Sequence, residues 1–207
     1  MRPDDDPTAI IEVVCTGNIC RSPYAQALLR SAAADRLDHP SLVRVLSCGI
    51  AGLEGEAASD GTLMEAARRG LDLTGHAGAR WTEERMRVAD IVITMSATHR
   101  THITDRVEGT SAKTFTIREL VRLASHVDTA DDPASPRERI RRFAVAANAA
   151  RPFVSRPREP EDVDDPYGGP PEGYARMAAQ VDRLVLALVD HLLGPLPDVD
   201  HQLFDRR

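Results

Sequence analysis

Thirteen residues near the amino terminus combine a cysteine, an arginine and a serine at a spacing that suits attack on phosphorus. The stretch from Ile11 to Pro23 reads I-E-V-V-C-T-G-N-I-C-R-S-P. A cysteine at a helix amino terminus beside a cation ionises readily, so Cys15 is the candidate nucleophile. The guanidinium of Arg21 matches two oxygens of a phosphate. The hydroxyl of Ser22 can donate to the thiolate and make it a better leaving group.

The residues on either side predict that this loop joins a strand to a helix. The run Ile10–Val14 predicts an apolar strand in the centre of a parallel sheet. Pro23 favours the first position of a helix, which is expected to extend to about Leu37. Gly17 and Asn18 tolerate the left-handed backbone that turns loop amides inward. Those amides and the helix amino terminus could then converge on one small anion.

The string V-C-T-G-N-I-C-R-S-P resembles the signature loop of the low-molecular-weight protein tyrosine phosphatases. The resemblance implies that Cys15 attacks phosphorus and that Arg21 binds the phosphate. It implies that Cys20 can trap oxidised Cys15 as a reversible disulfide. The remaining loop residues would contact the substrate; they are Thr16, Gly17, Asn18, Ile19, Cys20 and Ser22.

Two segments further along the chain carry the same resemblance. The segment from Gly70 to Met95 is similar to a family segment whose histidine supports the loop, which implies that His76 hydrogen-bonds Asn18. Asn18 and Ser22 would share in this support.

The second segment, V-D-D-P-Y-G-G-P-P-E-G-Y from Val163, resembles the family's acid loop. A departing phenoxide needs a proton, and the resemblance implies that Asp165 supplies it and later acts as the base. Tyr167 would form an aromatic wall for a phenyl phosphate. Asp164 is the rival for the acid role.

Strands alternate with helices along the chain, which predicts an α/β fold with a parallel sheet. We expect a three-layer α/β/α architecture with a four-stranded parallel sheet, of the phosphatase I-like type. Cys15 would lie at the carboxyl end of its strand, where ligands bind in such sheets. The other expected strands are Leu42–Ser47, Val88–Met95 and Lys113–Thr116. The other expected helices are Asp60–Arg69, one that begins at Ser96, Ile117–Ser125 and about Glu172–Leu193.

The expected domain covers residues 9–194, between a loose tail at 1–8 and a carboxyl-terminal tail at 195–207. Residues from about Ala124 to Glu161 are expected to form an insertion that compact family members lack. Its Arg-rich part has two open interpretations. It could be a solvated excursion packed on the domain edge, or a basic rim near the mouth of the site that recruits anionic substrates or a protein partner.

Composition excludes several classes of function. The net charge of −6 argues against general nucleic-acid binding, and no apolar run reaches the ~20 residues of a membrane span. The acidic amino terminus lacks the apolar segment of a secretion signal, and three cysteines fit a reducing cytoplasm. No metal is expected, because no clustered ligand set is present, and no cofactor is expected.

The sequence therefore predicts a protein tyrosine phosphatase that acts through a phosphocysteine on tyrosine-phosphorylated proteins, such as a bacterial tyrosine kinase. A thiol-coupled arsenate reductase could use the same loop. The thioredoxin-coupled type also needs a close pair of cysteines downstream, where only Cys48 remains. The type coupled to a low-molecular-weight thiol needs fewer cysteines, but D-P-Y has no obvious task in it. A protein arginine phosphatase is also open, although that family tends to carry threonine where Ile19 stands. The non-enzymatic alternative is a phosphate-binding module.

Overall fold

A computed structural model describes residues 7–127, 135–155, 157 and 161–196 of the chain. Four parallel strands form one sheet in the order β2-β1-β3-β4. The strands are β1 (Ala9–Cys15), β2 (Val43–Gly49), β3 (Ile91–Thr94) and β4 (Thr114–Thr116). The predicted four-stranded parallel sheet is confirmed. Most of the two expected tails lies outside the described residues.

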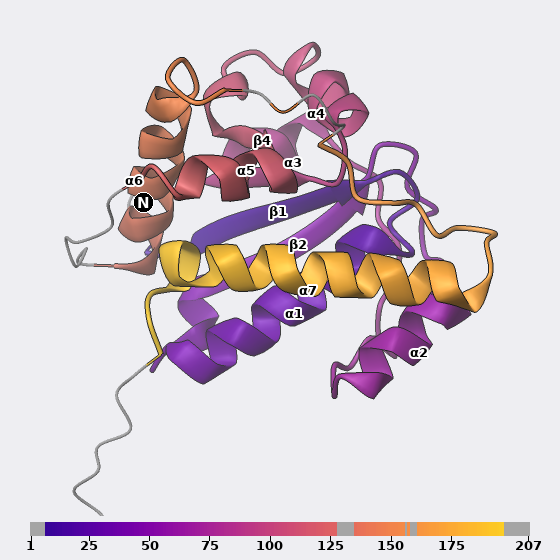
Figure 1. Ribbon diagram of the computed structural model, residues 1–207. Coiled ribbons are helices and arrows are strands. Elements are labelled where there is room, and N and C mark those ends of the chain that lie inside the picture. The colour runs from indigo at the N-terminus through magenta and orange to yellow at the C-terminus, as the bar shows by residue number, and fades with distance from the viewer. Residues whose placement is uncertain (1–6, 128–134, 156, 158–160, 197–207) are drawn as a thin grey trace, which may run out of the picture.

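Helices cover both faces of this sheet, which gives the predicted three layers. They are α1 (Arg21–Arg36), α2 (Asp60–Arg68), α3 (Glu83–Val88), α4 (Ala97–Thr104), α5 (Ile117–Ala124), α6 (Pro136–Ala150) and α7 (Pro171–Leu193). Figure 1 shows α1 and α7 lying across one face, where they pack on each other. On the opposite face, Met86 of α3 and Ile103 of α4 pack against Val14 and Val92. None of the helices within the described ranges is long and apolar enough to cross a membrane.

The third strand is shorter than predicted because helix α3 takes in its first residue, Val88, and two further residues lead from the helix into the strand. Thr82 caps α3 by accepting a hydrogen bond from the backbone N–H of Arg85, and Glu83 and Glu84 lie in the first turn. Carboxylates near a helix amino terminus are favourable. Val88 consequently ends α3, and β3 begins only at Ile91.

The central strand contains one charged residue that the prediction of an apolar strand overlooked. Glu12 is fully buried in β1, and Arg85 of α3 donates to both of its oxygens, at 3.2 and 2.7 Å. The same guanidinium donates to the backbone carbonyl of Ser47 at 2.9 Å. Burial raises the pKa of Glu12, and the ion pair with Arg85 opposes that rise. Since a buried charge is tolerated only when it is paired, this contact fixes α3 on the sheet.

Helix α6, in the expected insertion, is part of the hydrophobic core. Its side chains Ile140, Phe143 and Ala147 are almost fully buried in the main core cluster. Arg137 and Arg141 of α6 pair with Asp90, at 3.1 and 2.6 Å. Asp90 also accepts from the backbone N–H of Ile10, so these arginines lie where β1 and β3 begin. Figure 1 shows α6 near the end where β1 begins, opposite the carboxyl end of that strand. Cys15 is the last residue of β1. Arg137 and Arg141 therefore do not contribute to a basic rim at the mouth of the site, whereas Arg156 and Arg158 of the same segment lie outside the described residues.

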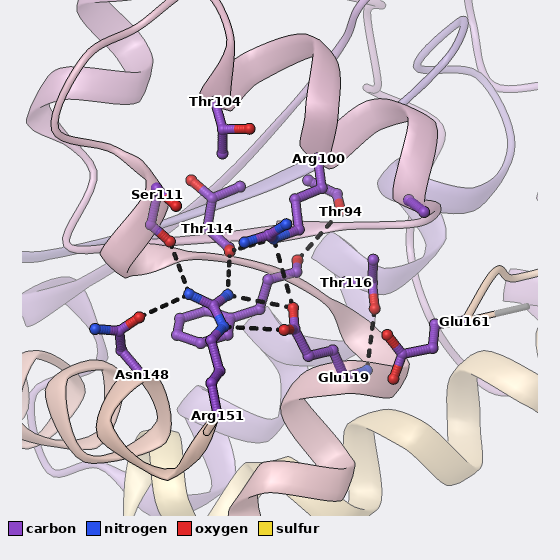
Figure 2. A network of polar contacts seen from close by, with 12 residues as sticks. Thr94, Arg100, Thr104, Ser111, Thr114, Thr116, Glu119, Asn148, Arg151 and Glu161 are labelled. Carbon is purple, nitrogen blue, oxygen red and sulfur yellow. Dashed lines mark hydrogen bonds and ion pairs between the residues drawn. The ribbon is translucent and has the colours of Figure 1, made fainter. Parts of the chain in front are cut away.

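A second cluster of polar contacts attaches the carboxyl end of α6 (Figure 2). Arg151 donates to both oxygens of Glu119 in α5, at 2.9 and 3.2 Å, and to the backbone carbonyls of Ser111 and Thr114. Its guanidinium also lies 4.1 Å from the ring centre of Phe115. One side chain thus joins α6, β4 and α5.

We expect Arg151→Met to lower the free energy of unfolding by about 2–4 kcal/mol, because Glu119 is buried and would lose its closest cation. Arg142→Met is the matched control. Its pair with Glu138 is exposed, so the loss there should stay within about 0.5 kcal/mol. Urea denaturation measures both values, and equal losses would contradict this account of α6.

Candidate active site

Cys15 is the last residue of β1 and is buried beneath the loop that leads into α1. The hydroxyl of Ser22 donates to its sulfur at 2.9 Å, and the backbone N–H of Asn18 lies 3.3 Å from the same atom. Helix α1 begins at Arg21, so its amino terminus faces this sulfur. Donors and a helix amino terminus both stabilise negative charge, which is what a thiolate nucleophile requires.

Asn18 determines the shape of the loop. Its φ of 59° makes it the single non-glycine residue with a left-handed backbone among those described. Its side-chain amide donates to Ser22 at 2.9 Å and to Ser47 at 2.8 Å, and its side-chain oxygen accepts from the backbone N–H of Ala79 at 2.8 Å. His76 Nε2 lies 2.7 Å from the backbone oxygen of Asn18. The loop is therefore held from β2 and from the segment before α3.

The segment after β2 supports the loop from outside. The backbone N–H groups of Ile50, Ala51 and Leu53 donate to the carbonyls of Cys15, Thr16 and Gly17, respectively. A Cβ atom at Gly49 would lie 2.2 Å from the carbonyl oxygen of Thr16, so only glycine permits this close approach.

Arg21 lies at the carboxyl side of the loop and is almost fully buried. One of its terminal nitrogens, Nη2, donates to Thr16 Oγ1 at 3.0 Å and to Asp165. The other, Nη1, lies 3.4 Å from the carbonyl of Val163. Its Nε is buried without a hydrogen-bond partner. A buried donor without a partner is costly, and a phosphoryl oxygen could accept from it.

The two acidic residues of the D-D-P-Y segment point to different partners. Asp165 pairs with Arg21, and its other oxygen accepts from the backbone N–H of Tyr167 at 3.3 Å. Asp164 instead accepts from Gln180 of α7 at 2.9 Å. Asp165 is therefore the carboxyl group that the structure places beside the loop.

These residues surround a cavity of about 230 Å³. Leu53 and Tyr167 are both exposed at this cavity, with 41% and 66% of their surface accessible. Cys15 and Arg21 line the cavity, together with Ala51, Leu53, Asp165 and Tyr167. Four more of the predicted loop residues also line it: Thr16, Gly17, Ile19 and Cys20. The predicted loop and acid segments thus meet at one site, although 142 residues separate Arg21 from Val163 along the chain.

Sequence reasoning missed His99, which is buried on the other side of the loop. Its Nε2 lies 2.9 Å from Thr16 Oγ1. Burial and the nearby charge of Arg21 lower the pKa of His99 to about 3. The sequence signal that could have revealed His99 was Ser96, which follows the third strand and caps α4. A helix that starts there places His99 in its first turn, at the carboxyl edge of the sheet.

All three cysteines are free and buried. Cys20 Sγ lies 3.2 Å from the hydroxyl of Ser59, and burial raises the pKa of Cys20. Burial and the nearby Glu12 raise the pKa of Cys48. These two thiols are thus held in the protonated form. The disulfide between Cys15 and Cys20 stays a prediction.

No group of three or more histidine, cysteine or acidic residues that could hold a metal ion is present in the described part of the chain.

The family model described as low molecular weight phosphotyrosine protein phosphatase matches residues 10–145. The chain belongs to this family. Among relatives of this phosphatase, Etp of Escherichia coli (strain K12), a low molecular weight protein-tyrosine-phosphatase, is 39% identical over 94 residues. That match covers 45% of this chain and 59% of Etp, which is less than two thirds of the relative's length.

Another relative of the phosphatase matches over a longer stretch. A protein-arginine-phosphatase of Geobacillus stearothermophilus is 27% identical over 179 residues, which cover 86% of this chain and 93% of that protein. The solved structure of the YwlE arginine phosphatase from Geobacillus stearothermophilus has a TM-score of 0.64 at 26% identity. It covers 96% of this chain and 98% of that chain, so the two share the fold.

The left-handed backbone of Asn18 can be separated from its hydrogen bonds by two substitutions in the phosphatase. Both Asn18→Gly and Asn18→Ala remove the side-chain bonds, and both should lower kcat/KM by at least about tenfold. Alanine also places a Cβ in a left-handed conformation, so Asn18→Ala should be less stable than Asn18→Gly by about 1 kcal/mol. Thermal unfolding compares the two variants, and equal stabilities would show that backbone strain is not felt here.

His99 should make the stability of the phosphatase depend on pH. Its pKa of about 3 lies below the unfolded value of roughly 6.5, so in this range the unfolded chain binds a proton that the folded protein does not. Its contribution to stability is present above about pH 6.5 and is lost as pH falls toward 3. We expect wild type to lose more unfolding free energy than His99→Gln between pH 7 and 4. Urea denaturation at each pH measures the unfolding free energy of both proteins. An equal loss in wild type and in His99→Gln would contradict this expectation.

Proposed function

We propose that this chain hydrolyses phosphotyrosine monoesters through a phosphocysteine intermediate. The observation that carries the proposal is the arrangement around one cavity of a buried sulfur with two donors, an arginine with an unpartnered Nε, and a carboxyl group. Family membership supports the same reaction class. Cys15 is the nucleophile, Arg21 binds the phosphate and Asp165 is the general acid and base.

In the first step the Cys15 thiolate attacks phosphorus, and the bond from phosphorus to the phenolic oxygen breaks. Asp165 gives its proton to the departing oxygen, which leaves as a neutral tyrosine. Arg21 and the loop amides stabilise the charge on the equatorial oxygens. The sulfur then carries the phosphoryl group.

In the second step water attacks the phosphocysteine, and Asp165 takes the proton that water loses. The phosphorus–sulfur bond breaks, phosphate departs and the thiolate returns. Ser22, which lies 2.9 Å from the sulfur, stabilises it as a leaving group.

The contact between Arg21 and Asp165 has to change when substrate binds. A phosphate dianion competes for the guanidinium, because Arg21 Nη2 contacts the Asp165 carboxylate in the free site. Binding would therefore release Asp165 toward the ester oxygen, and the freed carboxylate takes up from solvent the proton that it gives to the departing oxygen. The negative charge of the substrate would in this way free Asp165 to act as the general acid.

The mouth of the cavity favours a phenyl group over a guanidinium. Ile19, Leu53 and Tyr167 present apolar surface there, and Asp165 is the single acidic residue in the lining. A phosphoarginine side chain would bring its own guanidinium cation into the site in addition to that of Arg21, and this second cation would need an acidic partner of its own. The long match with a protein-arginine-phosphatase keeps that substrate as the second candidate. The substrate that we propose is a tyrosine-phosphorylated protein, such as a bacterial tyrosine kinase. The proposed location is the reducing cytoplasm.

The test is hydrolysis of phosphotyrosine and phosphoarginine peptides by wild type, Cys15→Ser and Asp165→Asn in the presence of a metal chelator. We expect phosphotyrosine turnover by wild type, none by Cys15→Ser, and a loss of about 10²–10⁴-fold in kcat for Asp165→Asn. Asp164→Asn is the matched control and should stay within about threefold of wild type, since Asp164 contacts Gln180.

A preference for phosphoarginine would transfer the protein to the second candidate and show that Ile19 does not determine the substrate. Turnover of neither peptide, together with thiol-dependent reduction of arsenate, would reject the phosphatase proposal.

A further inference from the structure

The hydroxyl of Thr16 is contacted from two sides. Arg21 Nη2 lies 3.0 Å from Thr16 Oγ1, and His99 Nε2 lies 2.9 Å from the same oxygen. A guanidinium has only donors, so Thr16 Oγ1 accepts from Arg21. The remaining question is whether the hydroxyl donates to His99 or accepts a second hydrogen bond from it.

The other nitrogen of His99 answers this question. Nδ1 is buried and has no hydrogen-bond partner. If Nδ1 carried the proton, a buried donor would be left unpaired, which is rare and costly; an unused acceptor is tolerated more often. Burial keeps the ring neutral, because it lowers the pKa of His99 to about 3. The ring therefore carries its one proton on Nε2 and donates to Thr16.

This assignment leaves the hydroxyl proton of Thr16 without a partner among its two neighbours. Both lone pairs of Oγ1 are used, one by Arg21 and one by His99. Thr16 lines the cavity together with Cys15, Arg21 and Asp165. The hydroxyl can therefore donate into the cavity, where a phosphoryl oxygen would be the acceptor.

We propose that His99 is a positioning residue for the phosphatase reaction, which acts through Thr16. It orients the Thr16 hydroxyl as a donor to a non-bridging phosphoryl oxygen, and it fixes the oxygen atom that holds Arg21 Nη2 in place. This inference rests on the proposed function, since it concerns the same cavity. It gives roles to the side chains of Thr16 and His99, in addition to those of Cys15, Arg21 and Asp165.

The test is a double-mutant cycle measured with a small aryl phosphate. Thr16→Val keeps the shape of the side chain and removes the hydroxyl, and His99→Leu removes the ring donor. We expect each to lower kcat/KM by about tenfold, the effect of one hydrogen bond to a charged group. The double variant should be no worse than Thr16→Val alone, because His99 acts only through that hydroxyl.

His99→Gln provides the rescue, because its amide can donate from a position close to Nε2. We expect its kcat/KM within about threefold of wild type, and thus well above that of His99→Leu. Thr16→Ser, which keeps the hydroxyl, should behave likewise. If His99 merely fills space, glutamine gives no rescue, or the losses of His99→Leu and Thr16→Val multiply in the double variant. Either result would overturn the proposal.

Binding of inorganic phosphate, measured by calorimetry, separates this proposal from the proposed function. The phosphate affinities of the same variants should follow the same order, with the double variant equal to Thr16→Val. If the phosphate affinities follow that order but the wild type is inactive, the phosphatase reaction is rejected, and the positioning of Thr16 for a bound phosphate is retained. Normal turnover without coupling between His99 and Thr16 would reject the positioning role alone.

Discussion

The loop between β1 and α1 depends on a single residue in an unusual conformation. Asn18 combines a left-handed backbone with side-chain hydrogen bonds to α1, to β2 and to the segment before α3. The conformation is costly for most residues, and those bonds are what hold it. Because Asn18 also brings its own N–H toward Cys15, the support reaches the Cys15 sulfur directly. The loop is thus shaped before any phosphate arrives, and preorganised donors lose no energy in reorientation during the reaction.

The sheet explains why residues distant in the sequence meet at this loop. Parallel strands place all their carboxyl ends at one edge, and β1, β2 and β3 deliver Cys15, the Gly49 segment and the His99 helix to it. Helix α7 follows the acid segment and packs along α1, which brings Asp165 back to Arg21. Apolar packing of α7 therefore positions a residue that the local sequence could not place by itself.

The sequence predicted the parts of the site that have a local signature. Cys15, Asn18 and Arg21 lie in one short string, and Asp165 precedes a proline in a segment that resembles the family. The contacts of Glu12 with Arg85, and of His99 with Thr16, join residues 73 and 83 positions apart. Such pairs leave no periodic or spacing signal, because they form only when the sheet is assembled. The short helix α3 was missed for a related reason, since its apolar end merges with the strand that follows.

The position of α6 has a consequence for how this protein can change over evolutionary time. Its Arg137 and Arg141 bind at the edge where the strands begin, whereas the cavity lined by Cys15 lies at the opposite edge. Substitutions at well-separated sites tend to have additive effects on stability. A chain with extra stability at the distant edge can tolerate destabilising changes near the cavity, including those that alter which substrate is accepted. Helix α6 would thus widen the range of cavity-lining loops that this scaffold can carry while remaining folded.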